Sequence, residues 1–384
     1  MKFKKILILF LIVAIFLTHF ININAITYEY DSLLTNDSKS ACLIEAKTGT
    51  VLYSKNEHDK LAPASMTKIM TMILVMEKLN KNLIKKDDLV TTPKEASSLG
   101  GSQIYLSEGE KMTVHDLLKA MCIASANDAA MSLAIYVGGN EKNFIKMMND
   151  KAKELNLQNT NFENPYGFDN DNHFSSSYDM AMMARHLIMN YPDILSYTSI
   201  YEDYVREDTT KKFWLVNTNK LVKFMDGVDG LKTGWTEKSG YCLTATISKN
   251  NERFIAVSMG NTSTTKRNQE VSNLLNYGLI NYETKTIYEK DEIVKEISDV
   301  NYNSKKLVFK TTDEVVIVKN KNNDLQEIKT IEHIDIENKN NYIDVYYNNK
   351  LYKRTYLKCN ESQDKNSLFN LVFNIIKEIL LISK

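Results

Sequence analysis

The sequence predicts an α+β fold: a mixed sheet flanked by helices, followed by a small all-β domain. Strand-like patterns lie at both ends of a region from about residue 40 to residue 281, and helical periodicity dominates between them. After about residue 285, short alternating strands are separated by Asn, Lys and Asp. The strands at the two ends of the first region are therefore expected to form one sheet, against which the intervening helices pack.

The N-terminal part of this region begins with strands and continues with helices. The stretch SACLIEAKTGTVLYSKN, from Ser40, indicates two strands around a turn at Lys47-Thr48-Gly49. SMTKIMTMILVMEKL, from Ser65, has apolar residues at helical spacing, and Thr113 is expected to cap a later helix with Asp116 at its third position. Further helices are expected from Asp128 to Gly138, at 142–155 and at 178–190.

From Val228 the hydrophobic period changes to two, which is typical of strands. GLKTGWTE, GYCLTATISKN and ERFIAVSMG predict three consecutive antiparallel strands, and KRNQEVSNLLNYGLINY predicts a closing helix. Beyond it, KLVFKTT, EVVIVKN, YIDVYY and LYKRTYLK predict strands of the small β domain. The expected boundaries are 26–284 for the first domain and 285–362 for the second.

The two ends of the sequence predict an exported protein. Three lysines precede an apolar run from Ile6 to Leu17, and a cleavage site is expected after Ala25, so residues 1–25 resemble a secretory signal. An uncleaved anchor is the alternative. Residues 363–384 are expected to form an amphipathic helix that lies in the membrane interface; the alternative is a packing helix of the last domain.

The composition argues against nucleic-acid binding, a zinc site built from cysteines and a disulfide framework. Basic and acidic residues balance at 48 each, so no overall field favours nucleic acid as a partner. The four cysteines are too widely spaced for a zinc knuckle or a disulfide framework, so they are expected to be mostly buried free thiols. They are Cys42, Cys122, Cys242 and Cys359.

Three short motifs follow one another in the first domain: Ser65-x-x-Lys68, Ser125-Ala-Asn127 and Lys232-Thr-Gly234. Each pattern recurs elsewhere in the chain, so its surroundings decide its meaning. Ser65 and Lys68 share one face at the start of an apolar helix, where free backbone N–H groups favour developing negative charge. Ser65 is therefore the expected nucleophile and Lys68 its general base.

A lysine base must lose its proton. The ordinary Lys pKa is about 10.4, and a mostly neutral Lys68 requires a fall of more than about 3, which costs roughly 4–5 kcal/mol. Burial and a second nearby cation supply this effect. Lys232 is the expected second cation, which is a physical reason for the first and third motifs to face each other.

The other motif residues are expected to bind and orient substrate. Ser125 is expected to pass a proton to the leaving group and Asn127 to hold a substrate amide or orient Lys68; a helix N-cap is the alternative for this pair. Lys232 and Thr233 are expected to bind a carboxylate, and Gly234 to allow a ligand backbone to approach. The backbone N–H groups of Trp235 and Ser65 can stabilise an oxyanion. The earlier Lys-Thr-Gly at 47–49 is expected to be a structural turn.

With these motifs in this order, the chain resembles the serine penicillin-recognising enzymes. The stretches APASMTKIMT, GGSQIYLSEGEKMTVHDLLKAMCIASANDAA and VDGLKTGWTEKSGYCLTAT resemble the low-molecular-mass D-alanyl-D-alanine carboxypeptidases. The resemblance implies a β-lactamase/transpeptidase-like fold and removal of the terminal D-alanine from peptidoglycan stem pentapeptides through an acyl-enzyme on Ser65. It also implies covalent inhibition by β-lactams, location at the outer face of the cytoplasmic membrane, and no metal or cofactor.

Three related readings stay open. A β-lactamase needs a base for the deacylating water, for which Glu163 in FENPYGF is a weak candidate; an endopeptidase and a non-catalytic sensor are the others. His173 in DNHFSSSYDMA resembles a family position near the cleft, but a structural role is favoured. Thr218 stands where some relatives carry Arg, which leaves part of the carboxylate site unassigned.

Overall fold

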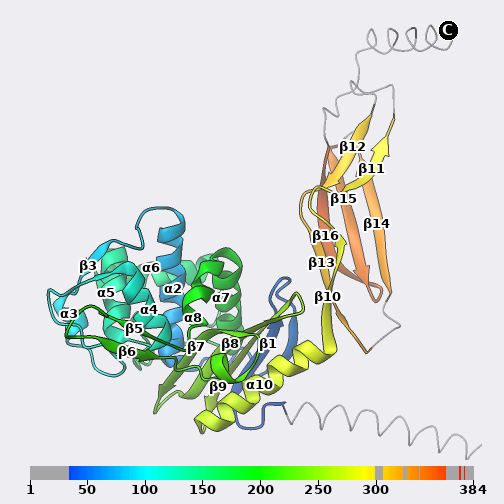
Figure 1. Cartoon of the computed structure of the whole chain (residues 1–384). Coiled ribbons are helices and arrows are strands. Elements are labelled where there is room, and N and C mark those ends of the chain that lie inside the picture. Colours follow the sequence, from blue (N-terminus) through cyan, green and yellow to red (C-terminus); the bar gives the residue numbers. More distant parts are fainter. Residues whose placement is uncertain are drawn as a thin grey trace, which may run out of the picture. The chain divides into compact units, whose positions relative to one another are not determined.

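The chain, as a computed structural model, divides into two compact units (Figure 1). The structure describes residues 34–298, 306–322, 327–336 and 338–359, together with Val372 and Ile376. The first unit ends at Leu279 and the second begins at Ile280. The signal predicted at 1–25 lies outside the described residues, and so does the C-terminal helix predicted at 363–384, apart from those two positions.

A five-stranded sheet of order β2-β1-β9-β8-β7 forms the centre of the first unit. Neighbouring strands are antiparallel throughout. The predicted α+β fold class is confirmed, but the sheet expected to be mixed is antiparallel, because hairpins join β1–β2 and β7–β8–β9 and β1 runs antiparallel to β9. The strands are β1 (Ser40–Glu45), β2 (Val51–Lys55), β7 (Val228–Thr236), β8 (Gly240–Lys249) and β9 (Glu252–Asn261).

Both faces of this sheet are buried, as Figure 1 shows with helices on either side. Cys42, Ile44 and Val257 face the large core beneath the main helical layer. Phe254 is fully buried and lies against Gly278 of α10 (Thr264–Asn281), where a Cβ would come within 2.9 Å of the Phe254 ring. The alternation of strand side chains therefore supplies an apolar residue to each face.

The main helical layer contains the helices predicted from the sequence. Thr113 caps α4, accepting a hydrogen bond from Asp116 N at 3.0 Å, as predicted. Ser65 lies in a 3₁₀ turn, η1 (Ala64–Thr67), immediately before the regular helix α2. The principal helices are α2 (Lys68–Asn80), α4 (Val114–Ile123), α5 (Asn127–Gly138), α6 (Glu141–Glu154) and α7 (Ser177–Asn190).

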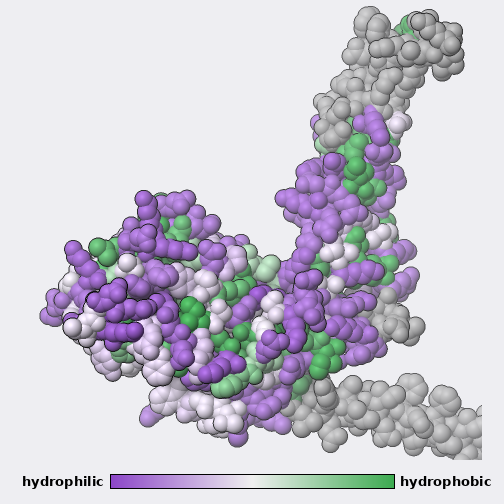
Figure 2. Space-filling model, viewed as in Figure 1, coloured by the Kyte–Doolittle hydropathy of each residue, from purple (hydrophilic) through white to green (hydrophobic). Residues whose placement is uncertain are grey.

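Short elements without strong hydrophobic periodicity connect these parts. They are α3 (Lys94–Ser97), η2 (Pro192–Ile194), α8 (Leu195–Thr198), α9 (Leu221–Phe224) and the hairpins β3 (Leu89–Thr91)–β4 (Lys111–Thr113) and β5 (Glu202–Val205)–β6 (Phe213–Val216). On the face shown in Figure 2, hydrophilic and pale side chains cover most of the helical layer. This agrees with helices whose apolar sides point inward.

The second unit is all-β, as predicted, with its own core around Phe309, Ile317 and Ile343. Its strands form a sheet of order β11-β12-β16-β15-β14 and a separate β10–β13 pair. They are β10 (Tyr282–Tyr288), β11 (Ile293–Ile297), β12 (Leu307–Thr311), β13 (Val315–Asn320), β14 (Ile328–Asp335), β15 (Asn340–Tyr347) and β16 (Lys350–Cys359).

The prediction for the cysteines can be compared with the described residues. Cys42, Cys122 and Cys242 are buried free thiols, as predicted, and Cys359 is a half-buried one. Within the described part of the chain, no helix is both long enough and apolar enough to cross a bilayer.

Candidate active site

A cleft of about 370 Å³ opens where β7 passes the turn η1 and the start of α10. Residues from all three motifs line it, although the motifs are separated by up to 167 positions in the sequence (232 minus 65). The fold therefore brings Ser65, Ser125 and the Lys232 strand to one place. The lining includes Ser65, Ser102, Ser125, Thr218, Thr233, Gly234, Trp235, Tyr241 and Arg267.

Lys68 Nζ lies 2.9 Å from Ser65 Oγ, 2.7 Å from Asn127 Oδ1 and 2.8 Å from the backbone oxygen of Tyr166. The last two oxygens can only accept hydrogen bonds. A neutral lysine has two N–H groups and one lone pair, so it satisfies both acceptors and keeps its lone pair for the Ser65 hydroxyl. The three contacts match a general base aimed at a nucleophile.

Burial favours the neutral form of Lys68. Its side chain is fully buried, and this holds the Lys68 pKa well below the ordinary value. The nearby charge of Lys232 lowers the Lys68 pKa further, while Asp128 opposes the change. Burial also lowers the pKa of Lys232 to about 7, with Cys122 opposing the fall and Arg267 adding to it. The pKa values of both lysines therefore lie below the ordinary range, which favours the neutral amine of each.

Ser125 and Asn127 lie at the break between α4 and α5. Ser125 is 4% exposed and has a left-handed φ of 63°, which turns the chain sharply into the cleft. Asn127 donates from Nδ2 to Gly100 O at 2.8 Å while its Oδ1 accepts from Lys68. The N-cap position of α5 is Ala126 and has no side-chain cap, so the alternative of a capping pair is not what the structure shows.

Gly234 also has a packing role that was not expected. A Cβ at this position would lie 2.7 Å from Pro63 O and 3.2 Å from Ser65 N, so glycine lets β7 pack closely against the nucleophile turn. Gly234 lines the cleft as well, and its expected role in the approach of a ligand backbone stays a prediction. Gly167, in the loop that contains Tyr166, also packs closely against the nucleophile turn, because a Cβ at this position would come 1.9 Å from Ala64 O. Ser65 is thus held between two glycine contacts.

Thr233, Trp235 and Thr218 complete the wall formed by β7. Thr233 Oγ1 donates to Thr218 Oγ1 at 2.8 Å, so the residue that replaces an expected arginine still belongs to the site. The Trp235 side chain is 54% exposed and lies beside Tyr241 at the cleft mouth. Lys232 Nζ donates to Thr233 O at 3.0 Å.

Two site features were missed in the sequence. Tyr166 contributes only its backbone oxygen, on a loop that Asn164 organises by accepting hydrogen bonds from the N–H groups of Tyr166, Gly167 and Phe168. Arg267 comes from α10, is 4% exposed and lines the cleft. Burial lowers its pKa to about 10, so the guanidinium stays charged at neutral pH.

The contacts of His173 indicate that it supports the fold rather than the reaction. Its Nδ1 accepts from Glu163 N at 2.9 Å, and its Nε2 lies 2.7 Å from Thr67 Oγ1, so the proton of the neutral ring is on Nε2. Burial lowers the His173 pKa to about 4. The Glu163 side chain is exposed and is not among the residues that line the cleft.

These contacts are those of a serine enzyme that transfers acyl groups, with a neutral lysine as base and a cationic wall for an anionic substrate group. Among the residues that the structure describes, no group of three or more His, Cys, Asp or Glu side chains is placed to hold a metal ion. The chain belongs to the D-alanyl-D-alanine carboxypeptidase family, peptidase family S11, whose model matches residues 27–263.

Individual relatives agree with this family. D-alanyl-D-alanine carboxypeptidase DacF of Bacillus subtilis (strain 168) is 48% identical over 298 residues, which is 78% of this chain and 76% of the relative. DacC of Escherichia coli (strain K12) is 36% identical over 262 residues, 66% of this chain and 64% of that protein.

Solved structures agree as well. Penicillin-binding protein 5 of Haemophilus influenzae has a TM-score of 0.75 at 27% identity, covering 84% of this chain and 96% of its own. Penicillin-binding protein D2 of Listeria monocytogenes, in a cefotaxime-bound form, has a TM-score of 0.57 at 30% identity, covering 63% and 97%. The family resemblance predicted from the motifs is confirmed.

Proposed function

We propose that this chain is a serine-type D-Ala-D-Ala carboxypeptidase that removes the terminal D-alanine from peptidoglycan stem pentapeptides. The observation that carries the proposal is the contact set of Lys68 Nζ: two acceptor-only oxygens and the Ser65 hydroxyl. Family membership supplies the substrate class. A base held neutral beside a serine has a catalytic use that a binding module does not need.

Acylation begins when Lys68 takes the Ser65 proton and Oγ attacks the carbonyl between the two D-alanines. The backbone N–H groups of Ser65 and Trp235 stabilise the oxyanion, and the close approach of β7 to η1 at Gly234 supports this assignment. The C–N bond breaks, Ser125 delivers a proton to the departing D-alanine amine and recovers one from Lys68, and the remaining tetrapeptide stays as an ester on Ser65. Water then attacks the ester, which releases the tetrapeptide and regenerates the serine.

Three groups are proposed to bind the terminal carboxylate. Lys232 and Arg267 supply positive charge from two different elements, and Thr233 supplies a hydroxyl already oriented toward Thr218. Arg267 is proposed to supply the carboxylate binding that Thr218 cannot, because a guanidinium binds a carboxylate in a bidentate manner and a hydroxyl does not. β-Lactams are proposed to occupy the same site and to acylate Ser65.

A β-lactamase is a weaker proposal because its second step requires a base for water. Glu163, the residue considered for it, is exposed and does not line the cleft.

An endopeptidase is also a weaker proposal. Arg267, Lys232 and Thr233 favour substrates with a free carboxylate, which supports carboxypeptidase over endopeptidase action. Tight carboxylate recognition favours the end of a chain over its interior.

The test is release of D-alanine from a synthetic stem pentapeptide, together with labelling by a fluorescent penicillin. The wild-type protein should do both, and Ser65→Ala should do neither. Normal labelling of Ser65→Ala would refute the nucleophile. A wild-type protein that labels but releases no D-alanine would favour the sensor alternative, and rapid repeated penicillin turnover would favour the β-lactamase.

We also propose that the enzyme works outside the cytoplasm, on the outer face of the membrane. The proposal rests on the signal-like segment at 1–25 and the amphipathic pattern at 363–384. Removal of 363–384 should move activity from the membrane fraction to the soluble exported fraction. Unchanged membrane association would contradict the role of this segment.

A further inference from the structure

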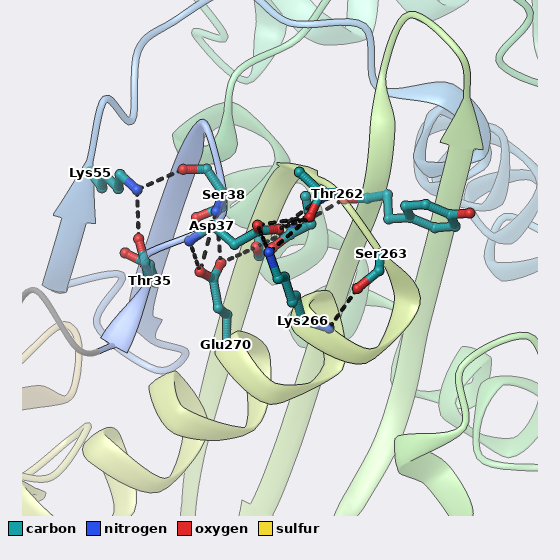
Figure 3. Close-up of polar contacts among 11 residues, drawn as sticks. Thr35, Asp37, Ser38, Lys55, Thr262, Ser263, Lys266 and Glu270 are labelled. Atoms are coloured by element: carbon teal, nitrogen blue, oxygen red, sulfur yellow. Dashed lines mark hydrogen bonds and ion pairs between the residues drawn. The ribbon is translucent and has the colours of Figure 1, made fainter.

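The first described residues lie beside the beginning of α10 (Figure 3), and Thr264 and Arg267 of that helix line the cleft. We propose that this segment, the N-terminal strap (Leu34–Ser38), positions Arg267 for carboxylate binding through the side chain of Asp37. The inference rests on the proposed function, because it assumes that Arg267 binds the substrate carboxylate. It makes Asp37 a positioning residue, outside the cleft, of the same reaction.

Asp37 binds both sides of the turn that starts α10. Its carboxylate accepts hydrogen bonds from Thr262 N at 2.7 Å and Thr262 Oγ1 at 2.8 Å, and from Lys266 Nζ at 2.7 Å (Figure 3). The Asp37 side chain is 13% exposed but that of Lys266 is 58% exposed, so solvent screens this ion pair and it adds little to the hydrogen bonds from Thr262. A carboxylate at the start of a helix also interacts favourably with the helix dipole.

The helix in turn holds the strap. Glu270, one turn after Lys266, accepts from Asp37 N at 2.5 Å and Ser38 N at 3.2 Å, and its own side chain is buried. Lys55 Nζ donates to the backbone oxygens of Thr35 and Ser38 on the far side of the strap. The strap and the first two turns of α10 are therefore fixed to each other at several points.

Arg267 directly follows Lys266 in this first turn. Its backbone N–H donates to Ser263 O at 3.1 Å, and Ser263 Oγ accepts from Lys266 N at 3.2 Å. The Arg267 guanidinium donates to Asn268 Oδ1, on the same helix. Because the first turn of a helix frays readily, a clamp on Thr262 and Lys266 determines how firmly the Arg267 backbone is held.

The experiment measures acylation rate constants of the full chain with benzylpenicillin and with its methyl ester, which lacks the free carboxylate. Asp37→Ala should slow acylation by benzylpenicillin by about five- to tenfold, because a small misplacement of a binding group is costly. The methyl ester should react with both proteins at rates within about twofold, since Arg267 has no partner on it.

A double-mutant cycle tests whether Asp37 acts through Arg267. In an Arg267→Gln background, Asp37→Ala should cause no further loss toward benzylpenicillin. Asp37→Asn, which still accepts from Thr262 N, should fall between wild type and Asp37→Ala. Asp226→Ala, which removes an exposed ion pair to Lys249 at 3.0 Å, is the matched control and should leave both rates unchanged.

Each contrary outcome is distinct. Equal losses for benzylpenicillin and the ester, or additive losses in the cycle, would show a general structural effect of Asp37 and overturn the inference. Unchanged benzylpenicillin acylation in Asp37→Ala would overturn it while leaving the proposed function intact. The same result in Arg267→Gln would overturn it together with the proposed carboxylate role of Arg267, but not the carboxypeptidase activity. A wild-type protein that neither binds penicillin covalently nor releases D-alanine would refute the proposed function itself.

Discussion

Lys68 and Lys232 are buried in the same cleft wall but are suited to different tasks. Burial lowers the pKa of Lys68, and its contact with Ser65 Oγ places it to supply a lone pair, whereas Lys232, with a pKa of about 7, can still be charged when the substrate arrives. Burying two amines costs free energy, but it serves the reaction. The positive charge of Lys232, which favours carboxylate binding, also lowers the pKa of the base Lys68.

This difference predicts a bell-shaped pH dependence of the acylation rate constant. The rate should rise with pH as Lys68 loses its proton, and fall above about pH 7 as Lys232 loses its own and carboxylate binding weakens. Lys232→Arg should move the alkaline limb upward, because a guanidinium remains protonated. Stopped-flow labelling between pH 5 and 10 is the measurement, and an unmoved alkaline limb would assign it to another group.

His173 predicts a different pH effect, on stability. Its folded pKa of about 4 lies below the ordinary histidine value of 6.5, so the unfolded state binds more protons between these pH values. Stability should therefore fall as pH drops from about 6.5 to 4, by up to roughly 3 kcal/mol for this group.

In His173→Asn, thermal unfolding should depend less steeply on pH over this range, although the variant is less stable at pH 7 because its hydrogen bonds to Glu163 N and Thr67 are disturbed. The acid limb of the acylation profile should stay in place. A shifted acid limb would assign His173 a catalytic role instead.

At the scale of elements, one tripeptide has two unrelated roles. Lys47-Thr48-Gly49 forms the turn between β1 and β2, where Glu45 accepts from Lys47 N and Thr48 N, and Gly49 has a φ of 76°. Lys232-Thr233-Gly234 lies within β7, where Thr233 and Gly234 line the cleft and the charge of the buried Lys232 acts on Lys68. The element, not the tripeptide, determines the role.

The two lysines therefore form a matched pair for mutation. Lys232→Ala should reduce penicillin acylation by about 100-fold or more, because it removes charge that acts on both the carboxylate and Lys68. Lys47→Ala should leave acylation within about twofold, since its backbone makes the turn contact. Comparable losses in both variants would show that the turn copy contributes to the site.

Comparing the predicted site with the observed one also shows which features of the site can be predicted from the sequence. Ser65 and Lys68 could be paired from helical spacing, and Lys232 could be selected because its strand follows both other motifs. The Tyr166 carbonyl could not be found, because a backbone oxygen leaves no residue-type signal. Arg267 was missed because α10 appeared only as a closing helix, and its proximity to the cleft depends on how that helix packs on the sheet.

At the scale of the whole molecule, the catalytic groups all belong to one compact unit. The described cleft residues lie between Ser65 and Arg267, and this unit extends to Leu279. The second unit has its own apolar core, with Leu307, Phe309 and Val345 fully buried. Each core is sufficient reason for its unit to fold by itself.

Two separable units predict that a chain ending after Asn281, which retains all of α10, keeps the active site. Its penicillin acylation rate should lie within about twofold of the full chain, since every described residue that lines the cleft lies before the cut. In calorimetry the full chain should show two transitions, and acylation should raise the midpoint of one, because a ligand stabilises only the unit that binds it. The fragment should retain that same shifted transition. A fragment that is folded by circular dichroism but does not acylate would show that the second unit is needed to complete the site.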